Sequence, residues 1–299
     1  MKRYLDPKND LPFKRVFGEH PKLLISFLNA LMPFEKGQYI TSLEYLPTEQ
    51  VPENPAKKNS IVDVRCKDNY NRQFIVEMQM YWSKSFSNRM VFNASKAYVR
   101  QLEKNENYDL LQTVYGLGIL NDVFENKTQK YYHHFKTINC ENNNEIVDGL
   151  EYVIIELPKF VPVNLTEKRM AVLWLRFLKE IEDEKYIIPA AELMENEYIR
   201  QAIELCEEGA FTEAERHAYD KYWDVVRVER TIIRDGIQKG IDEGRKEGID
   251  IGRKEGIEKE KENTVIKSYK NGASLEFISS ITDLSIEKIT SILQRNKLM

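Results

Sequence analysis

The stretch SIVDVRCKDNYNRQFIVEMQMYW, residues 60–82, decides the fold of this chain. Residues 60–67 and 73–81 are rich in β-branched and aromatic side chains, which favour strands. The polar run at 68–72 between them is typical of a turn. The pattern therefore predicts a β-hairpin centred on Tyr70.

Two carboxylates interrupt the apolar strands of this hairpin. Asp63 lies in the run I-V-D-V and Glu77 in the run F-I-V-E-M. The register predicts that Asp63 lies opposite Glu77 on one sheet face, which Gln79 shares. Acids on strands are often solvated surface charges, but apolar strands are usually buried, and a buried carboxylate needs a partner. The setting therefore favours a site for Mg²⁺ or Mn²⁺, since Mg²⁺ takes one or two carboxylates together with water and phosphate oxygens.

The segments around the hairpin alternate between helical and strand patterns. Residues 10–31 carry apolar side chains at helical spacing, which predicts one helix ended by Pro33. Residues 83–104 predict an amphipathic helix. Further strands are expected within residues 110–124, at 131–138 and at 151–157. From about residue 166 onward the pattern is helical.

Length and composition fit a folded globular protein. The 299 residues are enough for one large core with an appendage, or for two domains. No apolar run is long enough to span a bilayer, and no apolar stretch follows the basic N-terminus, so neither a membrane span nor a signal peptide is expected. Three unclustered cysteines predict a reducing cytoplasm, and with only four histidines a thiolate or histidine-rich metal site is disfavoured.

Charge is distributed unevenly along the chain. The net charge of −4 disfavours binding to nucleic acid by simple electrostatic attraction. Residues 1–104, however, contain 17 lysines and arginines against 11 acids. A basic N-terminal part is compatible with contacts to DNA phosphates.

A glycine repeat occupies the region 236–259. Glycine occurs at every fourth position from 236 to 256, and GRKEGIDI (244–251) is followed by GRKEGIEK (252–259). Each glycine costs a helix about 1 kcal/mol relative to alanine. Isoleucines beside the glycines supply a narrow apolar line. Two interpretations remain open: a charged spacer, or a helix that pairs closely with a second copy and makes a homodimer.

Residues 263–296 predict a small helical module. Ser274 and Ser285 are suited to cap two short helices, with a turn at 283–285 between them. The spacing is that of a helix-turn-helix, which often binds DNA. A helical cap without DNA contact is slightly favoured, because the last helix carries few basic residues.

The hairpin residues IVDVRCKDNYNRQFIVEMQM resemble those of the PD-(D/E)xK nucleases. The chain also contains DLPFKRVFG (10–18), YWSKSFSNRMVFNASKAYVRQL (81–102) and LEYVIIELPKF (150–160). As an ordered set, these segments resemble the Rpn family, the recombination-promoting nucleases that are also described as transposases. The glycine repeat recurs at the C-terminus of that family.

The resemblance implies an α/β fold with a restriction-endonuclease-like core over residues 1–160. This core contains a helix, a three-stranded meander, a helix and a strand. An all-α C-terminal region is expected to follow. It comprises a helical part at 161–235, a glycine-repeat helix or spacer at 236–262 and a helix-turn-helix-like module at 263–299.

The resemblance also implies a function. A metal-dependent endonuclease that hydrolyses DNA phosphodiester bonds in recombination or mobile elements is expected. Asp63 and Glu77 would bind Mg²⁺ or Mn²⁺, and the Met78 carbonyl would complete the protein ligands. Gln79 stands where the broader superfamily places lysine; as an amide it can orient water but cannot act as a cation or a base.

Three further residues are candidates for supporting roles. Lys14 is a candidate for the missing positive charge, Asp10 for assisting the metal and Arg89 for contacting phosphate. The alternatives are a surface lysine, a helix N-cap and an ion-paired helix residue, respectively. A rival for the whole chain is a non-catalytic DNA-binding or self-assembling protein that retains the nuclease fold.

Overall fold

A computed structural model gives the structure of the chain and describes residues 3–51, 58–142, 145–164, 169–181 and 189–299. The chain divides into two compact units, Met1–Arg227 and Val228–Met299. None of the helices in the described residues combines the length and the apolar character that a membrane span requires.

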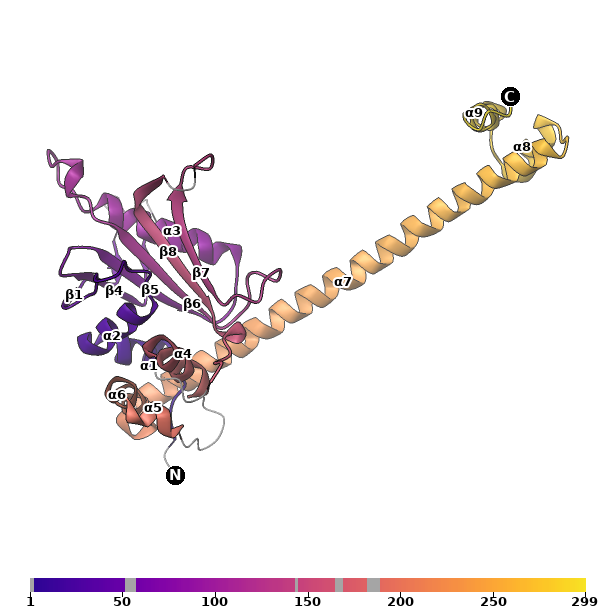
Figure 1. The fold of residues 1–299 in the computed structure, drawn as a ribbon. Helices are drawn as coiled ribbons and strands as arrows, with labels where there is room; N and C mark the ends of the chain where they lie inside the picture. The colour runs from indigo at the N-terminus through magenta and orange to yellow at the C-terminus, as the bar shows by residue number, and fades with distance from the viewer. Residues whose placement is uncertain (1–2, 52–57, 143–144, 165–168, 182–188) are drawn as a thin grey trace. The chain divides into compact units, whose positions relative to one another are not determined.

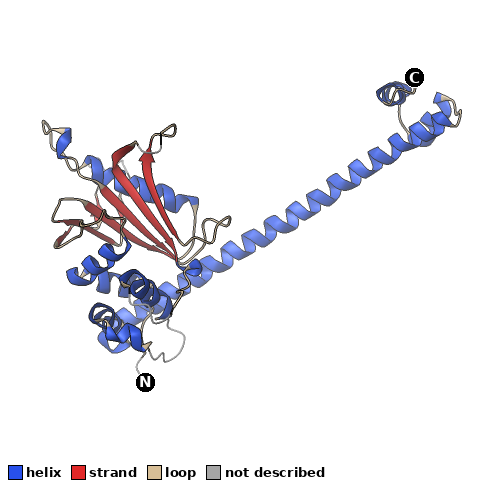
Figure 2. Cartoon of the chain, viewed as in Figure 1, coloured by secondary structure: helices blue, strands red, loops and turns tan. Residues whose placement is uncertain are grey.

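The first unit is built on a six-stranded mixed sheet (Figure 2). Its strands are β1 (Leu43–Tyr45), β4 (Val64–Asp68), β5 (Gln73–Gln79), β6 (Val114–Leu120), β7 (Tyr132–Ile138) and β8 (Ile146–Glu156). The order across the sheet is β1-β4-β5-β6-β8-β7. The meander β1-β4-β5 is antiparallel, the central strands β5, β6 and β8 are parallel, and β7 pairs antiparallel with β8 at the edge.

The hairpin formed by β4 and β5 has the register that the sequence predicts. Val64 pairs with Val76 and Lys67 with Gln73, so the turn is centred on Tyr70. The Asp68 carboxylate accepts the backbone N–H groups of Tyr70 and Arg72, each at 2.9 Å. Side-chain bonds to nearby backbone are the usual reason for aspartate in turns.

The first predicted strand of the hairpin, 60–67, is broken, and the expectation of a continuous strand is wrong. Residues Ser60–Ile61 form β3, which pairs with β2 (Glu49–Gln50) in a separate two-stranded sheet. Val62 N–H donates to the Thr48 carbonyl, and Asp63 lies in a bend directly before β4. Asp63 therefore lies beside β5 but outside the β4–β5 ladder, which ends at Val64. The predicted pairing of Asp63 opposite Glu77 is not formed.

The first predicted helix is also two elements. Helix α1 spans Asp10–Gly18 and α2 spans Pro21–Leu31. Pro21 is suited to a first helical position but not to a helix interior, because it has no N–H to donate and its ring collides with the preceding turn. The apolar period continues across the break, which is why the pattern alone predicted a single helix.

Helices cover both faces of the sheet (Figure 1). Helix α3 (Lys84–Val99) packs on one face, and α1, α2 and α4 (Met170–Glu180) pack on the other. Two glycines of β6 let α3 approach closely. A Cβ atom at Gly118 would lie 3.0 Å from Met90 Sδ and 3.1 Å from Phe86 Cζ. Because Gly116 and Gly118 carry no side chains, α3 can lie close to the middle of β6.

The remaining elements of the described chain are helical. They are η1 (Tyr108–Leu110), η2 (Leu157–Lys159), α5 (Ala191–Glu195), α6 (Glu197–Leu205), η3 (Glu208–Ala210), α7 (Glu213–Lys270), α8 (Leu275–Thr282) and α9 (Ile286–Arg295). The mixed α/β architecture with a helical C-terminal region agrees with the expected fold class. The glycines at 236–256 lie within the bounds of α7.

The second unit ends in a small helical module. The Ser274 side chain accepts the N–H of Phe277, and Ser285 accepts that of Lys288, so both predicted caps are confirmed. The module has its own apolar cluster, formed by Val265, Ile278, Ile289, Ile292 and Leu293.

Candidate active site

Asp63 is held against the end of β5 by a backbone hydrogen bond. Met78 N–H donates to Asp63 Oδ2 at 2.7 Å. Burial is the main cause that raises the pKa of Asp63, to about 7. The Met78 bond and Lys14 oppose this rise, while the charges of Asp10 and Glu77 add to it. The Asp63 carboxylate thus lies within the electrostatic reach of two other acids.

Glu77 is buried on the sheet face that α3 covers. Both of its carboxylate oxygens accept hydrogen bonds from that helix: Oε1 from Asn93 Nδ2 at 2.9 Å, and Oε2 from Arg89 Nε at 3.1 Å. A buried carboxylate requires such partners. Each oxygen retains a second lone pair, so these bonds fix the carboxylate without using all of its capacity as an acceptor.

Arg89 also ties Gln79 to Glu77. Arg89 Nη2 donates to Gln79 Oε1 at 2.8 Å, while the same guanidinium forms an ion pair with Glu77. The Arg89 side chain is still 45% exposed. Arg89 is therefore ion-paired, as the alternative interpretation of the sequence expected, and one part of its guanidinium still faces solvent.

Asp10 and Lys14 lie on the first turns of α1 and form an exposed i,i+4 ion pair, with Lys14 Nζ 2.7 Å from Asp10 Oδ1. Both residues act electrostatically on Asp63, in opposite directions. Asn9 caps α1, because its side chain accepts the N–H of Leu11. The structure thus brings Asp10 and Lys14 into the surroundings of Asp63, and the cap role is taken by another residue.

The direction of the Met78 carbonyl follows from the alternation of successive carbonyl groups along β5. Gln79 O accepts the N–H of Asn121 on the β6 side of β5. Successive carbonyls of a strand point to opposite sides, so the Met78 carbonyl points away from β6. Asp63 lies on that same side, where it receives the Met78 N–H.

Asn93 and Gln50 are site residues that the sequence did not reveal. Asn93 is fully buried and follows Arg89 by one helical turn. Gln50 is also buried, and its Nε2 lies 3.5 Å from the Asn93 carbonyl. The only signal for Asn93 was a polar residue within the apolar stripe of α3. Gln50 comes from β2, a short strand that precedes the hairpin, and gave no signal.

The donor set was tested against a divalent cation. Among the described residues, no three His, Cys, Asp or Glu side chains gather closely enough to hold a metal by themselves. Mg²⁺ does not need three, since it keeps several waters and commonly takes one or two carboxylates. Asp63, Glu77 and the Met78 carbonyl offer only hard oxygen ligands, and the mutual repulsion of the acids is what a cation would relieve. The residues therefore fit this class of ion.

A family model described as PD-(D/E)XK nuclease family transposase matches residues 7–235. The chain belongs to this family. The resemblance read from the hairpin is thus confirmed, and membership indicates a nuclease-type domain linked to transposition. No curated protein and no solved structure matches the chain significantly.

Proposed function

We propose that this PD-(D/E)XK family member is a metal-dependent DNA endonuclease that hydrolyses phosphodiester bonds in transposition or recombination. One observation carries the proposal: Asp63, the buried Glu77 and the Met78 carbonyl adjoin one another at the end of β5. Their placement in a chain of this family supports a catalytic rather than a merely structural role.

Each residue has a distinct task in this proposal. Asp63, Glu77 and the Met78 carbonyl would hold Mg²⁺ or Mn²⁺. A cation bound there supplies charge neutralisation at the phosphate and lowers the pKa of a bound water. Gln79 orients the attacking water through its amide, because an amide donates and accepts hydrogen bonds but does not exchange protons at neutral pH.

Arg89 and Lys14 are proposed to meet the phosphate. The Arg89 guanidinium has five N–H donors, and its bonds to Glu77 and Gln79 leave others directed elsewhere. Lys14 is 40% exposed and pairs with the surface carboxylate of Asp10. Both cations can therefore approach a DNA backbone while they remain beside the carboxylates.

The test is nicking of supercoiled plasmid DNA by the purified full chain with Mg²⁺, with Mn²⁺ and with EDTA. We expect cleavage that EDTA abolishes, and at least a 100-fold loss in Asp63→Asn and Glu77→Gln. Asp109→Asn is the matched control, because Asp109 is an exposed acid in η1, the short helix that follows α3 in the chain. A parent protein that binds DNA but never cleaves it would favour the non-catalytic alternative, and cleavage retained by both site variants would refute the assignment of the residues.

A second copy of the chain is the proposed partner of α7. The isoleucines that line the glycine repeat are more than 40% exposed, and no described atom lies within 4 Å of a Cβ built on any of its six glycines. Small residues allow two helix backbones to approach closely, and the flanking isoleucines would fill the seam. Two-fold symmetry suits a nuclease that cuts both strands of a duplex.

A further inference from the structure

A buried carboxylate lies at the end of β8, away from the proposed metal ligands. Glu156 Oε1 accepts the N–H groups of Phe124 and Glu125, at 2.6 and 3.1 Å. Its Oε2 accepts from His133 Nε2 at 3.0 Å and from Lys159 Nζ at 2.7 Å. Four donors satisfy this carboxylate, so it serves to fix the loop after β6 against β7.

Next to this carboxylate lies a line of neighbouring rings, here named the aromatic row: Trp82, Phe124, His133 and Phe135. The ring centroids of Trp82 and Phe124 lie 4.9 Å apart, and those of Phe124 and His133 lie 4.8 Å apart. His133 and Phe135 are two residues apart on β7, and their rings are stacked at 6.5 Å. The row therefore runs from the end of β5 across to the edge strand.

Ring–ring and cation–π contacts connect the aromatic row to the proposed active site. The Trp82 ring lies 6.2 Å from that of Phe86, and the Arg89 guanidinium lies 5.2 Å from the same Phe86 ring. Arg89 in turn bonds to Glu77 and Gln79. The row thus begins two side chains away from the carboxylate.

The surroundings of the row combine aromatic surface with positive charge. Trp82, Phe124 and His133 are partly exposed, and Phe135 is 43% exposed. Lys127 and Lys130, in the loop that joins the row, are exposed and form no ion pair with a described residue. The nearby acids Asp122 and Glu125 accept backbone N–H groups of Trp82 and Lys127, which partly offsets their charge.

We propose that the aromatic row, together with Lys127 and Lys130, binds a single-stranded segment of DNA beside the cleavage site. Bases stack on partly exposed rings, and lysines neutralise the phosphates that join them. Bases inside a duplex are already stacked on one another and cannot reach a row of rings. This inference rests on the proposed nuclease function and deepens it: the substrate has an unpaired strand at the scissile bond.

The experiment measures binding without cleavage. The full chain carrying Asp63→Asn is titrated in EDTA against a fluorescein-labelled oligothymidine of about 12 nucleotides, read by anisotropy. Trp82→Ala and Phe135→Ser should each weaken binding by about 5- to 100-fold, which is the range for losing one stacked base. Trp82→Phe keeps a ring and should stay within about 3-fold of the parent.

Tyr108→Ala is the matched control, because Tyr108 is an 82% exposed aromatic residue after the opposite end of α3. It should leave the affinity unchanged. Phe135 is exposed, so its substitution should preserve folding, and far-ultraviolet circular dichroism verifies this for each variant. Unchanged affinity in both Trp82→Ala and Phe135→Ser overturns the inference, as does a duplex that binds as tightly as the single strand and loses affinity equally.

The two proposals fail separately. If the protein nicks plasmid DNA but its row variants bind the oligonucleotide normally, the nuclease proposal stands and the proposal for the aromatic row is refuted. If the protein never nicks DNA but its row variants lose affinity for the oligonucleotide, the proposal for the aromatic row stands and the nuclease proposal is refuted.

Discussion

At the scale of single residues, Asp63 is held in surroundings that oppose its own charge. It is partly buried, and two further acids act on it, so that its pKa is raised to about 7. A side chain chosen for stability alone would be neutral at this position. Carboxylates that are kept at such a cost commonly belong to functional sites.

A pH-dependent stability follows from this raised pKa. Because the folded-state pKa lies above that of the unfolded chain, the contribution of Asp63 to stability is complete below about pH 4 and is lost as the pH rises through about 7. Asp63→Asn should therefore stabilise the protein at pH 8 by about 1 to 3 kcal/mol, after allowance for solvent screening, and should have little effect near pH 4.

Urea unfolding in EDTA at the two pH values measures this difference, with Asp109→Asn as the control that should show no such gain. An Asp63→Asn variant less stable than the parent at pH 8 would contradict the electrostatic account.

Asn93 gives a second prediction at this scale. It donates to Glu77 Oε1 from a fully buried position, so it orients a proposed metal ligand without reaching the metal. Asn93→Ala should weaken Mn²⁺ binding by about 10- to 100-fold, the usual effect of removing a partner of a ligand. Titration calorimetry measures the affinity, and Asn88→Ala, an exposed change on the same helix, should leave it unaltered. Equal affinities in all three proteins would show that Asn93 only fills space.

The sequence alone pointed to Asp63, Glu77 and Gln79 as candidate site residues, but not to the side chains packed around them. Asp63 and Glu77 stood out as candidates because each interrupts an apolar run within one short hairpin, although Asp63 does not pair opposite Glu77 as the register predicted. Asn93 reaches Glu77 through the packing of α3, and Gln50 of β2 lies against the Asn93 carbonyl. Neither contact has a local signature, so neither could be predicted without the fold.

At the scale of elements, the hairpin turn was predictable and the two breaks were not. The turn is encoded within five residues, including an aspartate that bonds its own backbone. The interruption at Asp63 depends on a bond from Val62 to Thr48, which belongs to another segment. The break before Pro21 had a local signal, but the apolar period running through it favoured one helix.

The prediction at the scale of elements concerns Gly118, over which α3 packs closely on β6. Any side chain there meets Met90 and Phe86, so Gly118→Val should lift α3 and cost about 1 to 3 kcal/mol of unfolding free energy. Because α3 also carries Asn93 and Arg89, DNA cleavage should fall by more than the loss of folded protein explains. Denaturant unfolding and plasmid nicking are measured on the same preparation.

Gly209→Val is the control, since a Cβ there would meet no other described residue within 4 Å apart from the two chain neighbours. A Gly118→Val variant with full cleavage would show that the spacing of α3 does not govern the site.

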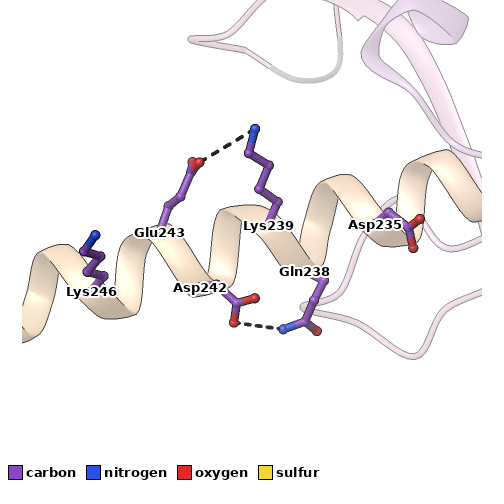
Figure 3. A pocket seen from close by; sticks show the side chains of 6 residues that line it. All are labelled: Asp235, Gln238, Lys239, Asp242, Glu243 and Lys246. Atoms are coloured by element: carbon purple, nitrogen blue, oxygen red, sulfur yellow. Dashed lines mark hydrogen bonds and ion pairs between the residues drawn. The ribbon is translucent and has the colours of Figure 1, made fainter.

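At the scale of the whole molecule, some charges of α7 pair along the helix itself, while its isoleucines are exposed. Lys239 pairs with Glu243 at 3.9 Å, and Gln238 donates to Asp242 at 3.0 Å (Figure 3). The hollow that these side chains line is open helix surface, not an enclosed ligand site. Burial of apolar side chains, rather than charge pairing, is thus the force available for association.

Ile237→Ser combined with Ile241→Ser should convert the proposed dimer to a monomer, because both side chains are more than half exposed and lie one turn apart. Multi-angle light scattering of the full chain decides the mass, with Lys239→Ser as the control on the same helix. A parent that is already monomeric across the concentration range would exclude α7 as an association element.

The glycines of α7 should also determine how fast its backbone amides exchange hydrogen with solvent. A helical amide exchanges its hydrogen with solvent only when its bond opens, and glycine makes opening easier. In a lone helix, deuterium should enter residues 236–256 well before it enters the root of α7 at 213–227, where Tyr219 and Val226 are buried. If two copies associate through residues 236–256, this early deuterium uptake should slow as the protein concentration rises. The rate at which these amides take up deuterium therefore reports the fraction of α7 that is paired with a second copy.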